Sequence, residues 1–514
     1  MALSIGDGKR VLAGAVFACA LALVGALLPA AATPAATEES TPASVARTIP
    51  VAPVDPASAA GRIVLPVADW LEQHFGSGSR GVRLTLDAPM WAEERDGTVI
   101  LHLPGARLVE PTAPLVQWTL GDLAIAVTPK DGTAYDFETA LPPSVHRKGE
   151  RLTIGDGSVS GTWRSDLEAT TRLEANAANL RLSDGEGSAA ETLSVGALAL
   201  ADEVQEGADG LWNGRFFFEV SKFSGEGFGL GRLEASGSFD DFDRDLAFHT
   251  RGDFSAIAGG MSGPTALADL LTPLMSGRWG RSEMTIALDD LTATIDGTGL
   301  SGRGEVSFGR LEWRVEADGR TDFMDLATRI AATDVAIGGG AIDDVPPTFM
   351  PHAATIDIAL RRLPLRRLAQ AFSALAEREA GQEPRHGSIA DDFLPHLDAA
   401  DSEFELRDIR AVAPAYEIRA DGRFQAESAS LFGVIGRIDA RIRGFDSLMA
   451  LAVKEGEEGM VAFLIVLQGL GRPVLDEGSD EPFYAYEIDL RRDGAVTVNG
   501  IPFDMLLSGD LSLQ

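Results

Sequence analysis

The sequence is poor in cysteine and in positive charge, and both shortages narrow what the protein can do. Cys19 is the only cysteine in 514 residues and lies in an apolar stretch near the N-terminus. If that stretch is removed, no thiol remains for a disulfide or a cysteine-ligated metal. The 44 Lys and Arg residues face 77 Asp and Glu, which gives a net charge of −33. This balance argues against nucleic acid as a partner, because phosphate binding needs clustered basic residues.

Motifs for catalysis and for metal binding are missing as well. No H-x-x-x-H or H-E-x-x-H pair occurs among the histidines, and no G-x-S-x-G elbow for a serine nucleophile is present. The seven histidines are His74, His102, His146, His249, His352, His386 and His396. We therefore expect a non-enzymatic protein with no catalytic, cofactor-binding or metal-binding residues.

Some local patterns have the appearance of sites, and each has a simpler interpretation. Residues 297–302 have the spacing of a dinucleotide-binding glycine loop, but Gly304–Phe308 then reads as a strand, which favours a hairpin. Asp241, Asp243 and Asp245 lack the glycine and the glutamate of a calcium loop. The remaining candidates are the basic group Arg361, Arg362, Arg366 and Arg367, expected on a solvated helix face, and the paired acids Asp289-Asp290, Asp343-Asp344 and Asp391-Asp392.

The N-terminus has the pattern of a targeting segment. Lys9 and Arg10 precede an apolar run over residues 11–28, and Ala30-Ala31-Ala32 follows. This order is typical of a secretory signal peptide over residues 1–32, and an uncleaved membrane anchor over residues 11–28 is the alternative. Residues 33–60 are rich in Pro, Ala and Thr, which predicts a linker. Both alternatives place the rest of the chain in the periplasm.

From about Gly81 onward the dominant period is two, which predicts strands with one apolar and one polar face. Met284, Ile286 and Leu288 are one example, and Ile356, Ile358 and Leu360 another. One-sided strands belong to antiparallel sheets. Turn signals separate them at Asp96-Gly97, Asp131-Gly132, Asp184-Gly185, Asp296-Gly297, Asp318-Gly319, Asp421-Gly422 and Asp493-Gly494. We predict a mainly β fold of long, curved antiparallel sheets, with a β-rich region over 61–345 and a β-plus-helix region over 346–514.

Few helices are expected, and they are amphipathic and packed across the sheets. The spacing of Leu365, Leu368 and Phe372 predicts a helix over 364–380. Further helices are predicted from Phe445 and from Met460 to Leu470. Shorter candidates are 67–74, 266–275 and 322–332.

The C-terminal part carries a resemblance to known envelope proteins. A strand over Ile438–Ile442 leads into two helices, and the second helix ends at Gly469-Leu470-Gly471. The closing strand pair contains Tyr484, Tyr486, Ile488, Leu490, Asp493-Gly494, Val496, Val498, Asn499-Gly500 and Pro502. This pattern resembles an uncharacterised alphaproteobacterial envelope family, the domain of unknown function numbered twenty-one twenty-five, and it is similar to YdgA-type and AsmA-like periplasmic proteins. The AsmA-like resemblance implies a lipid-carrying groove.

These observations lead to two expectations for function. Many one-sided strands and few helices predict a long apolar face that binds lipid or another envelope protein. The alternative is a periplasmic scaffold with a closed core that binds protein through exposed strand edges. Contact with the inner membrane is expected if the N-terminal segment is uncleaved.

Overall fold

The computed structural model describes most of the chain from residue 49 to residue 503. The described ranges are 49–75, 83–109, 117–147, 149–167, 169–184, 191–244, 280–296, 303–319, 323–338, 346–368, 370–371, 389–456, 458–475 and 481–503. The predicted signal segment and the predicted helix over 266–275 lie outside these ranges. No helix within the described ranges is long and apolar enough to cross a membrane.

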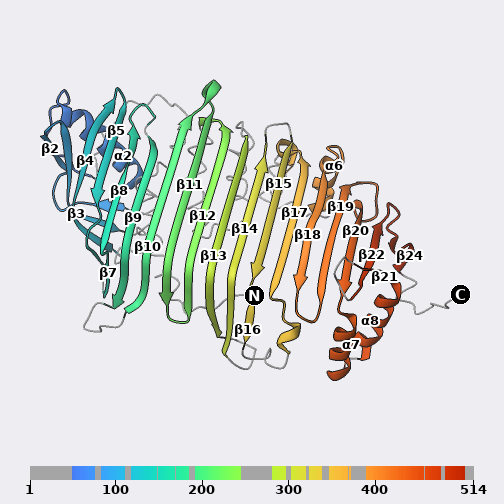
Figure 1. The fold of residues 1–514 in the computed structure, drawn as a ribbon. Coiled ribbons are helices and arrows are strands. Elements are labelled where there is room, and N and C mark those ends of the chain that lie inside the picture. Colours follow the sequence, from blue (N-terminus) through green and yellow to red (C-terminus); the bar gives the residue numbers. More distant parts are fainter. Residues whose placement is uncertain are drawn as a thin grey trace, which may run out of the picture. The chain divides into compact units, whose positions relative to one another are not determined.

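The chain divides into two compact units. Unit 1 contains residues 1–226 and 242–261, and unit 2 contains residues 227–241 and 262–514. The division expected at residues 345/346 falls inside unit 2. Both units are built from antiparallel strands with a few helices (Figure 1), so the predicted mainly β fold is confirmed.

Unit 1 is an antiparallel sheet packed against one helix, α2 (Ala59–Phe75). Its strands are β1 (Arg83–Thr85), β2 (Trp91–Arg95), β3 (Thr98–Val109), β4 (Gln117–Asp131), β5 (Ala134–Ala140), β6 (Ser144–Arg147), β7 (Glu150–Thr153), β8 (Asp156–Arg164), β9 (Ala169–Asp184), β10 (Glu191–Glu206) and β11 (Trp212–Gly225). Strands β1 and β2 both pair with β3, and β4 pairs with both β5 and β6. Strands β7 and β8 pair with β9. Strand β9 also pairs with β10, and β10 pairs with β11.

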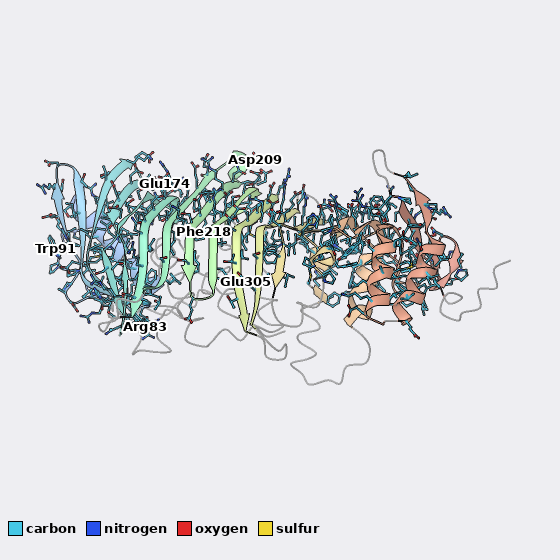
Figure 2. All side chains as sticks on the ribbon, turned by 60° about the horizontal axis from the view of Figure 1, so that its bottom comes forward. Arg83, Trp91, Glu174, Asp209, Phe218 and Glu305 are labelled. Atoms are coloured by element: carbon cyan, nitrogen blue, oxygen red, sulfur yellow. The ribbon has the colours of Figure 1, made fainter. Side chains whose placement is uncertain are left out.

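The core of unit 1 contains large side chains. Leu101, Phe137 and Leu173 are buried on the sheet, and Ile63 and Val64 of α2 are buried with them. Residues before α2, within the stretch expected to be a linker, also pack here: Ile49 is buried, and its backbone N–H donates to Glu72 over 2.8 Å. By the register, Glu174 of β9 and Phe218 of β11, labelled in Figure 2, lie on opposite faces of this sheet.

Unit 2 is a second antiparallel sheet in which most neighbouring strands are also neighbours in sequence. Its strands are β12 (Phe228–Phe242), β13 (Arg281–Asp296), β14 (Arg303–Asp318), β15 (Met324–Thr333), β16 (Ala336–Gly338), β17 (Ala353–Leu363), β18 (Glu403–Val412), β19 (Glu417–Ala426), β20 (Val434–Arg443), β21 (Arg472–Val474), β22 (Phe483–Leu490), β23 (Val496–Val498) and β24 (Ile501–Pro502). Strand β14 pairs with both β15 and β16, and β22 pairs with β20, β21 and β23.

Helices cover only part of unit 2. Helices α7 (Phe445–Lys454) and α8 (Glu458–Leu470) lie beside the last strands, and α6 (Ile389–Asp398) contacts β19 (Figure 1). Phe445, Leu464 and Tyr486 form the buried core between α7, α8 and β22. The two helices predicted from Phe445 and up to Leu470 are confirmed.

Turn chemistry explains why the strands reverse where they do. Asp96 and Gly97 take φ values of 52° and 81° between the paired residues Arg95 and Thr98. Asn499 and Gly500 do the same between Val498 and Ile501, with φ of 51° and 85°. Two-residue turns with both φ values positive match the twist of the flanking strands, and Asn, Asp and Gly adopt them most readily.

Three expectations differ from the structure. The predicted helix over 322–332 is wrong for its described part, because residues 324–332 belong to strand β15, where Leu326, Thr328, Ile330 and Ala332 share one face. Asp421-Gly422 is not a turn, because it lies inside β19. The basic residues Arg361 and Arg362 end strand β17 and do not lie on a helix. Residues 365–368, 370 and 371 are helical, and the rest of the predicted helix over 364–380 lies outside the described residues.

The last strands of unit 2 are short and contain proline. Strand β21 has three residues with Pro473 in the middle, and β24 has two residues and ends at Pro502. Proline has no N–H to donate to a neighbouring strand and is therefore confined to sheet edges and strand ends.

We expect Asn499 to stabilise the C-terminal end of unit 2. Its side-chain N–H groups donate to Leu470 over 2.7 Å and to Ala485 over 3.2 Å, and its Oδ1 accepts from the Glu487 N–H over 2.9 Å. Asn499→Gly keeps the positive φ but loses these bonds, so it should lower the free energy of unfolding by about 1–3 kcal/mol. Asn499→Ala should cost about 1 kcal/mol more, because alanine is strained at positive φ. Urea unfolding measures both, and equal stability of the two variants would contradict the backbone part of this account.

Candidate functional site

The two faces of the unit 2 sheet differ sharply in chemistry. Paired residues of adjacent antiparallel strands share a face, so the register traces each face across the sheet. One row runs from β12 to β22 through Ala235, Ile286, Trp313, Ile330, Ile356, Ile409, Ala420, Ala440 and Tyr486. Parallel rows on the same side contain Leu288 with Leu311 and Met284 with Val315. We call this side the apolar face.

Within the described residues, no second layer of large side chains closes the apolar face over β13, β14, β15, β17 and β18. Among the described side chains of these five strands, the buried hydrophobic residues are all alanines: Ala287, Ala317, Ala327 and Ala359. Trp313, Ile330 and Ile356, which pair in register on three adjacent strands, are 42%, 44% and 49% exposed. A packed core buries large side chains almost fully, so this stretch is an open apolar surface.

Trp313 is held in place within this surface. Its indole Nε1–H donates to the Thr328 hydroxyl of β15 over 2.9 Å, and Thr328 lies on the apolar face beside Ile330. The hydrogen bond satisfies the one polar atom of the indole and leaves the ring available for contact.

The opposite, polar face of the sheet carries ion pairs between residues two apart on one strand. The pairs in unit 2 are Arg232 with Glu234, Arg281 with Glu283, Arg310 with Glu312, Arg314 with Glu316, Glu417 with Arg419, and Arg437 with Asp439. Residues i and i+2 of a strand point to the same side, so the R-x-E and E-x-R spacings are the sequence signal for these contacts. Exposed pairs of this kind contribute at most about 1 kcal/mol each.

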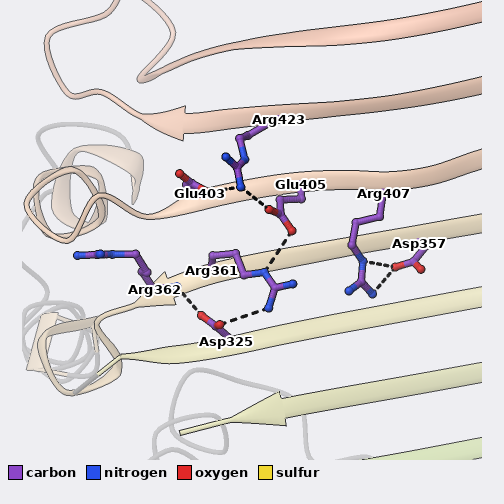
Figure 3. A network of polar contacts seen from close by, with 8 residues as sticks. All are labelled: Asp325, Asp357, Arg361, Arg362, Glu403, Glu405, Arg407 and Arg423. Carbon is purple, nitrogen blue, oxygen red and sulfur yellow. Dashed lines mark hydrogen bonds and ion pairs between the residues drawn. The ribbon is translucent and has the colours of Figure 1, made fainter. Parts of the chain in front are cut away.

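Ion pairs also join strands across the polar face (Figure 3). Arg361 donates through Nε to Glu405 over 3.2 Å and through Nη1 to Asp325 over 3.3 Å, which links β17 to β18 and β15. Arg423 of β19 donates to the other oxygen of Glu405 over 2.9 Å. The hydrogen bond from Arg423 holds the pKa of Glu405 below its ordinary value, although burial acts in the opposite direction. The network fixes the register of four strands and presents no open coordination site.

Among the described residues of unit 2, Glu417 is the one buried carboxylate, and three arginines surround it. Its side chain is 1% exposed. Its Oε1 accepts from Arg410 over 2.8 Å and from Arg419 over 2.7 Å, and its Oε2 lies 2.6 Å from Arg443. Arg419 and Arg443 also lie over the ring of the buried Phe483, at 4.9 and 5.0 Å from its centroid. Sequence reasoning missed this cluster, because its members come from three strands.

Pockets away from the apolar face occur in both units. One in unit 1, of about 250 Å³, is lined by residues of β4, β5, β8 and β9, among them Asp136 and Arg172. In unit 1, Ile63 and Val67 of α2 lie over Leu101, Phe137 and Trp163 and leave a cavity of about 60 Å³. That volume has room for only about two water-sized groups. Helix α2 therefore fills most of the space above these strands and closes the unit 1 core. In unit 2, a shallow pocket of about 430 Å³ lies between Pro346, Thr348 and Phe349, Pro414 and Ala415, and one side of α7 from Ser447 to Lys454. Lys454 is the one charged residue lining it.

The other patterns noted in the sequence fall into structural roles or outside the described residues. The glycine segment 297–302 is not described, but Asp296 pairs with Arg303, so the chain around it continues as two antiparallel strands. His102 stacks on Trp91 at 3.8 Å, and His146 contacts Ser144 over 3.0 Å. Asp289 accepts from Arg310 over 2.8 Å. Asp245, His249, His386, Asp343 and Asp344 lie outside the described ranges.

Metal ligands do not gather in the described part of the chain. There, no group of three or more His, Cys, Asp or Glu side chains could hold a metal ion. The apolar face of β13–β18 is the largest exposed apolar feature described above, with Trp313, Ile330 and Ile356 on adjacent strands.

Comparison with known proteins adds no relative. No protein-family model matches the chain, and neither a curated protein nor a solved structure matches it significantly.

We expect the Glu417 cluster to make stability depend on pH. Burial raises the pKa of Glu417, but the hydrogen bonds from Arg419 and Arg410 outweigh it and hold the pKa below its ordinary value. A lowered folded pKa means that the stabilisation is complete above the unfolded pKa, about 4.3. It is lost as the pH falls through the folded pKa. Urea midpoints between pH 7 and pH 3 measure this loss.

A substitution isolates the contribution of Glu417 to stability from that of the other carboxylates. Glu417→Gln should lower the free energy of unfolding at pH 7 by about 3–5 kcal/mol, because three guanidinium groups lose their counter-charge. The variant should also lose part of the pH dependence below pH 5. The matched change Glu305→Gln, at an exposed position of β14 (Figure 2), should change stability by less than about 0.5 kcal/mol. Equal effects of the two changes would contradict the role of the cluster.

Proposed function

We propose that this protein binds lipid through its acyl chains along the apolar face of β13–β18, as a non-enzymatic component of the cell envelope. The observation that carries the proposal is the row of Trp313, Ile330 and Ile356, three large side chains paired in register and each more than two-fifths exposed. Covering a large apolar side chain contributes about 1.5–3 kcal/mol, so a ligand that covers several of them is held firmly.

The shape and chemistry of the face favour an extended apolar ligand. The rows run across the strands, and adjacent strands are about 4.8 Å apart, so five strands offer a continuous surface about 20 Å long. Such a length suits an acyl chain. The described charges of these strands lie mainly on the other side, in ion pairs such as Arg310 with Asp289 and Arg407 with Asp357. An acyl chain therefore meets no unpaired charge along its path.

The alternative is a scaffold with a closed core that binds protein through strand edges. A closed core requires large buried side chains on the inner face of the sheet. Unit 1 has them in Leu101 and Phe137, whereas the buried positions described on β13–β18 are alanines. The burial pattern of unit 2 therefore favours the lipid proposal.

Location in the periplasm is part of the proposal and rests on the sequence. Lys9 and Arg10 followed by the apolar run over residues 11–28 are typical of an export signal or anchor. Export would bring the apolar face close to membrane lipids.

The proposal is tested by lipid that co-purifies with the protein. We expect mass spectrometry of solvent extracts of the purified protein to find phospholipid or fatty acid near one molecule per chain or above. Ile330→Asp combined with Ile356→Asp should reduce bound lipid at least about fivefold, because each change puts a charge on the acyl path.

A matched control keeps this test specific. Phe432→Asp makes the same kind of change at an exposed hydrophobic residue before β20, away from β15 and β17. It should leave bound lipid unchanged, and circular dichroism should report the same strand content for all variants. No lipid in the wild-type extract, or equal loss in the control, would overturn the proposal.

A further inference from the structure

Helix α8 presents a second exposed apolar surface, separate from the face of β13–β18. Met460, Phe463, Ile465 and Val466 are all exposed large hydrophobic residues, with Phe463 at 57% and Ile465 at 56%. On a helix, Ala462 and Val466 point away from the buried Leu464, and Phe463 and Ile465 flank them. We call this side the outer face of α8.

The inner face of α8 is fixed, so the helix cannot rotate to hide its outer face. Leu464 is buried against Tyr486 and Val498, and Val461 and Leu467 pack beside it. The Leu467 carbonyl accepts from the Tyr486 hydroxyl over 2.9 Å. Gln468 donates to the Tyr484 hydroxyl over 3.1 Å. These contacts hold one side of the helix on β22 and leave the other exposed.

The outer face of α8 has no charged or free hydrogen-bonding side chain that a protein partner could bind. Residues 459–470 contain no Asp, Glu, Lys or Arg, and the one amide side chain, Gln468, bonds to Tyr484. Protein interfaces of ordinary size carry about one hydrogen bond per 100–200 Å² and a polar rim. A helix that is apolar all round is normally buried in a protein core or in a membrane, and only the inner side of α8 is buried in this protein.

We infer that the outer face of α8 inserts into the surface of a lipid bilayer and docks unit 2 on a membrane. Phe463, Ile465 and Val466 enter the boundary between head groups and acyl chains, about 5–10 Å deep. Val453 of α7, together with Val474 and Leu475 after α8, are also exposed and extend the apolar surface at both ends of the helix. Lys454 lies 3.8 Å from Glu455 before the helix, Glu458 begins it and Arg472 follows it. These charges largely balance, so apolar contact drives the insertion.

The test uses a local probe in the full chain, so that the N-terminal segment does not dominate the result. In a Cys19→Ser background, a single cysteine at Phe463→Cys is labelled with the fluorophore NBD, and the protein is reconstituted with phosphatidylcholine vesicles. We expect a blue shift of the NBD emission. Vesicles that contain 5-doxyl phosphatidylcholine should quench this probe at least about twofold more than a probe at Leu431→Cys, an exposed residue before β20.

A second variant and a concentration series keep the inference falsifiable. Val466→Asp should abolish the blue shift at position 463, whereas Phe432→Asp should leave it unchanged, and salt should have little effect on either result. Equal quenching at positions 463 and 431 would overturn the inference. A shift that appears without vesicles and grows with protein concentration would also overturn it, because the partner would then be a second copy. The NBD signal at position 463 does not depend on lipid bound to the β13–β18 face, which the variant with Ile330→Asp and Ile356→Asp tests. One proposal can therefore be wrong while the other holds.

Discussion

In-register antiparallel pairing is the constraint on which the rest of this structure depends. A strand places successive side chains on opposite faces, so a one-residue slip would exchange the apolar and polar faces of its neighbour. The register from Ile286 through Trp313 and Ile330 to Ile356 keeps one side of unit 2 apolar across four strands. The ion pairs on the other side oppose such a slip, because pairs such as Arg361 with Asp325 join two of the same strands, β17 and β15.

The polar face also explains why the buried residues of these strands are small. Ala287, Ala327 and Ala359 lie on the polar side and are buried. The aliphatic parts of long Arg and Glu side chains on the same face cover such positions, as extended charged residues commonly do. A large residue there would separate the arginines from their carboxylates. The sheet is therefore held by backbone pairing and by the charged side, and this leaves the apolar side free for contact.

Much of the fold was predictable from sequence, because strand alternation and Asp-Gly or Asn-Gly turns are local. The helices α7 and α8 were predictable for the same reason. Residues 322–332 were mistaken for a helix because Phe323, Leu326 and Ile330 also fit helical spacing, and only pairing with β14 decides between the two. The long apolar face was expected, but its exposure and the three arginines around Glu417 were not determined by local pattern. Both depend on which strands become neighbours.

The proline residues at the C-terminal end of unit 2 have a consequence for assembly. An ordinary edge strand offers a row of N–H groups to any other extended chain, and this is how sheets grow into fibres. A molecule with long strands and an exposed apolar side is especially prone to such growth. Pro473 and Pro502 interrupt the donor row on the two shortest strands beside β22 and β23, and those strands are only three and two residues long. These two short, proline-containing strands therefore offer few N–H groups on which another extended chain could add to the sheet.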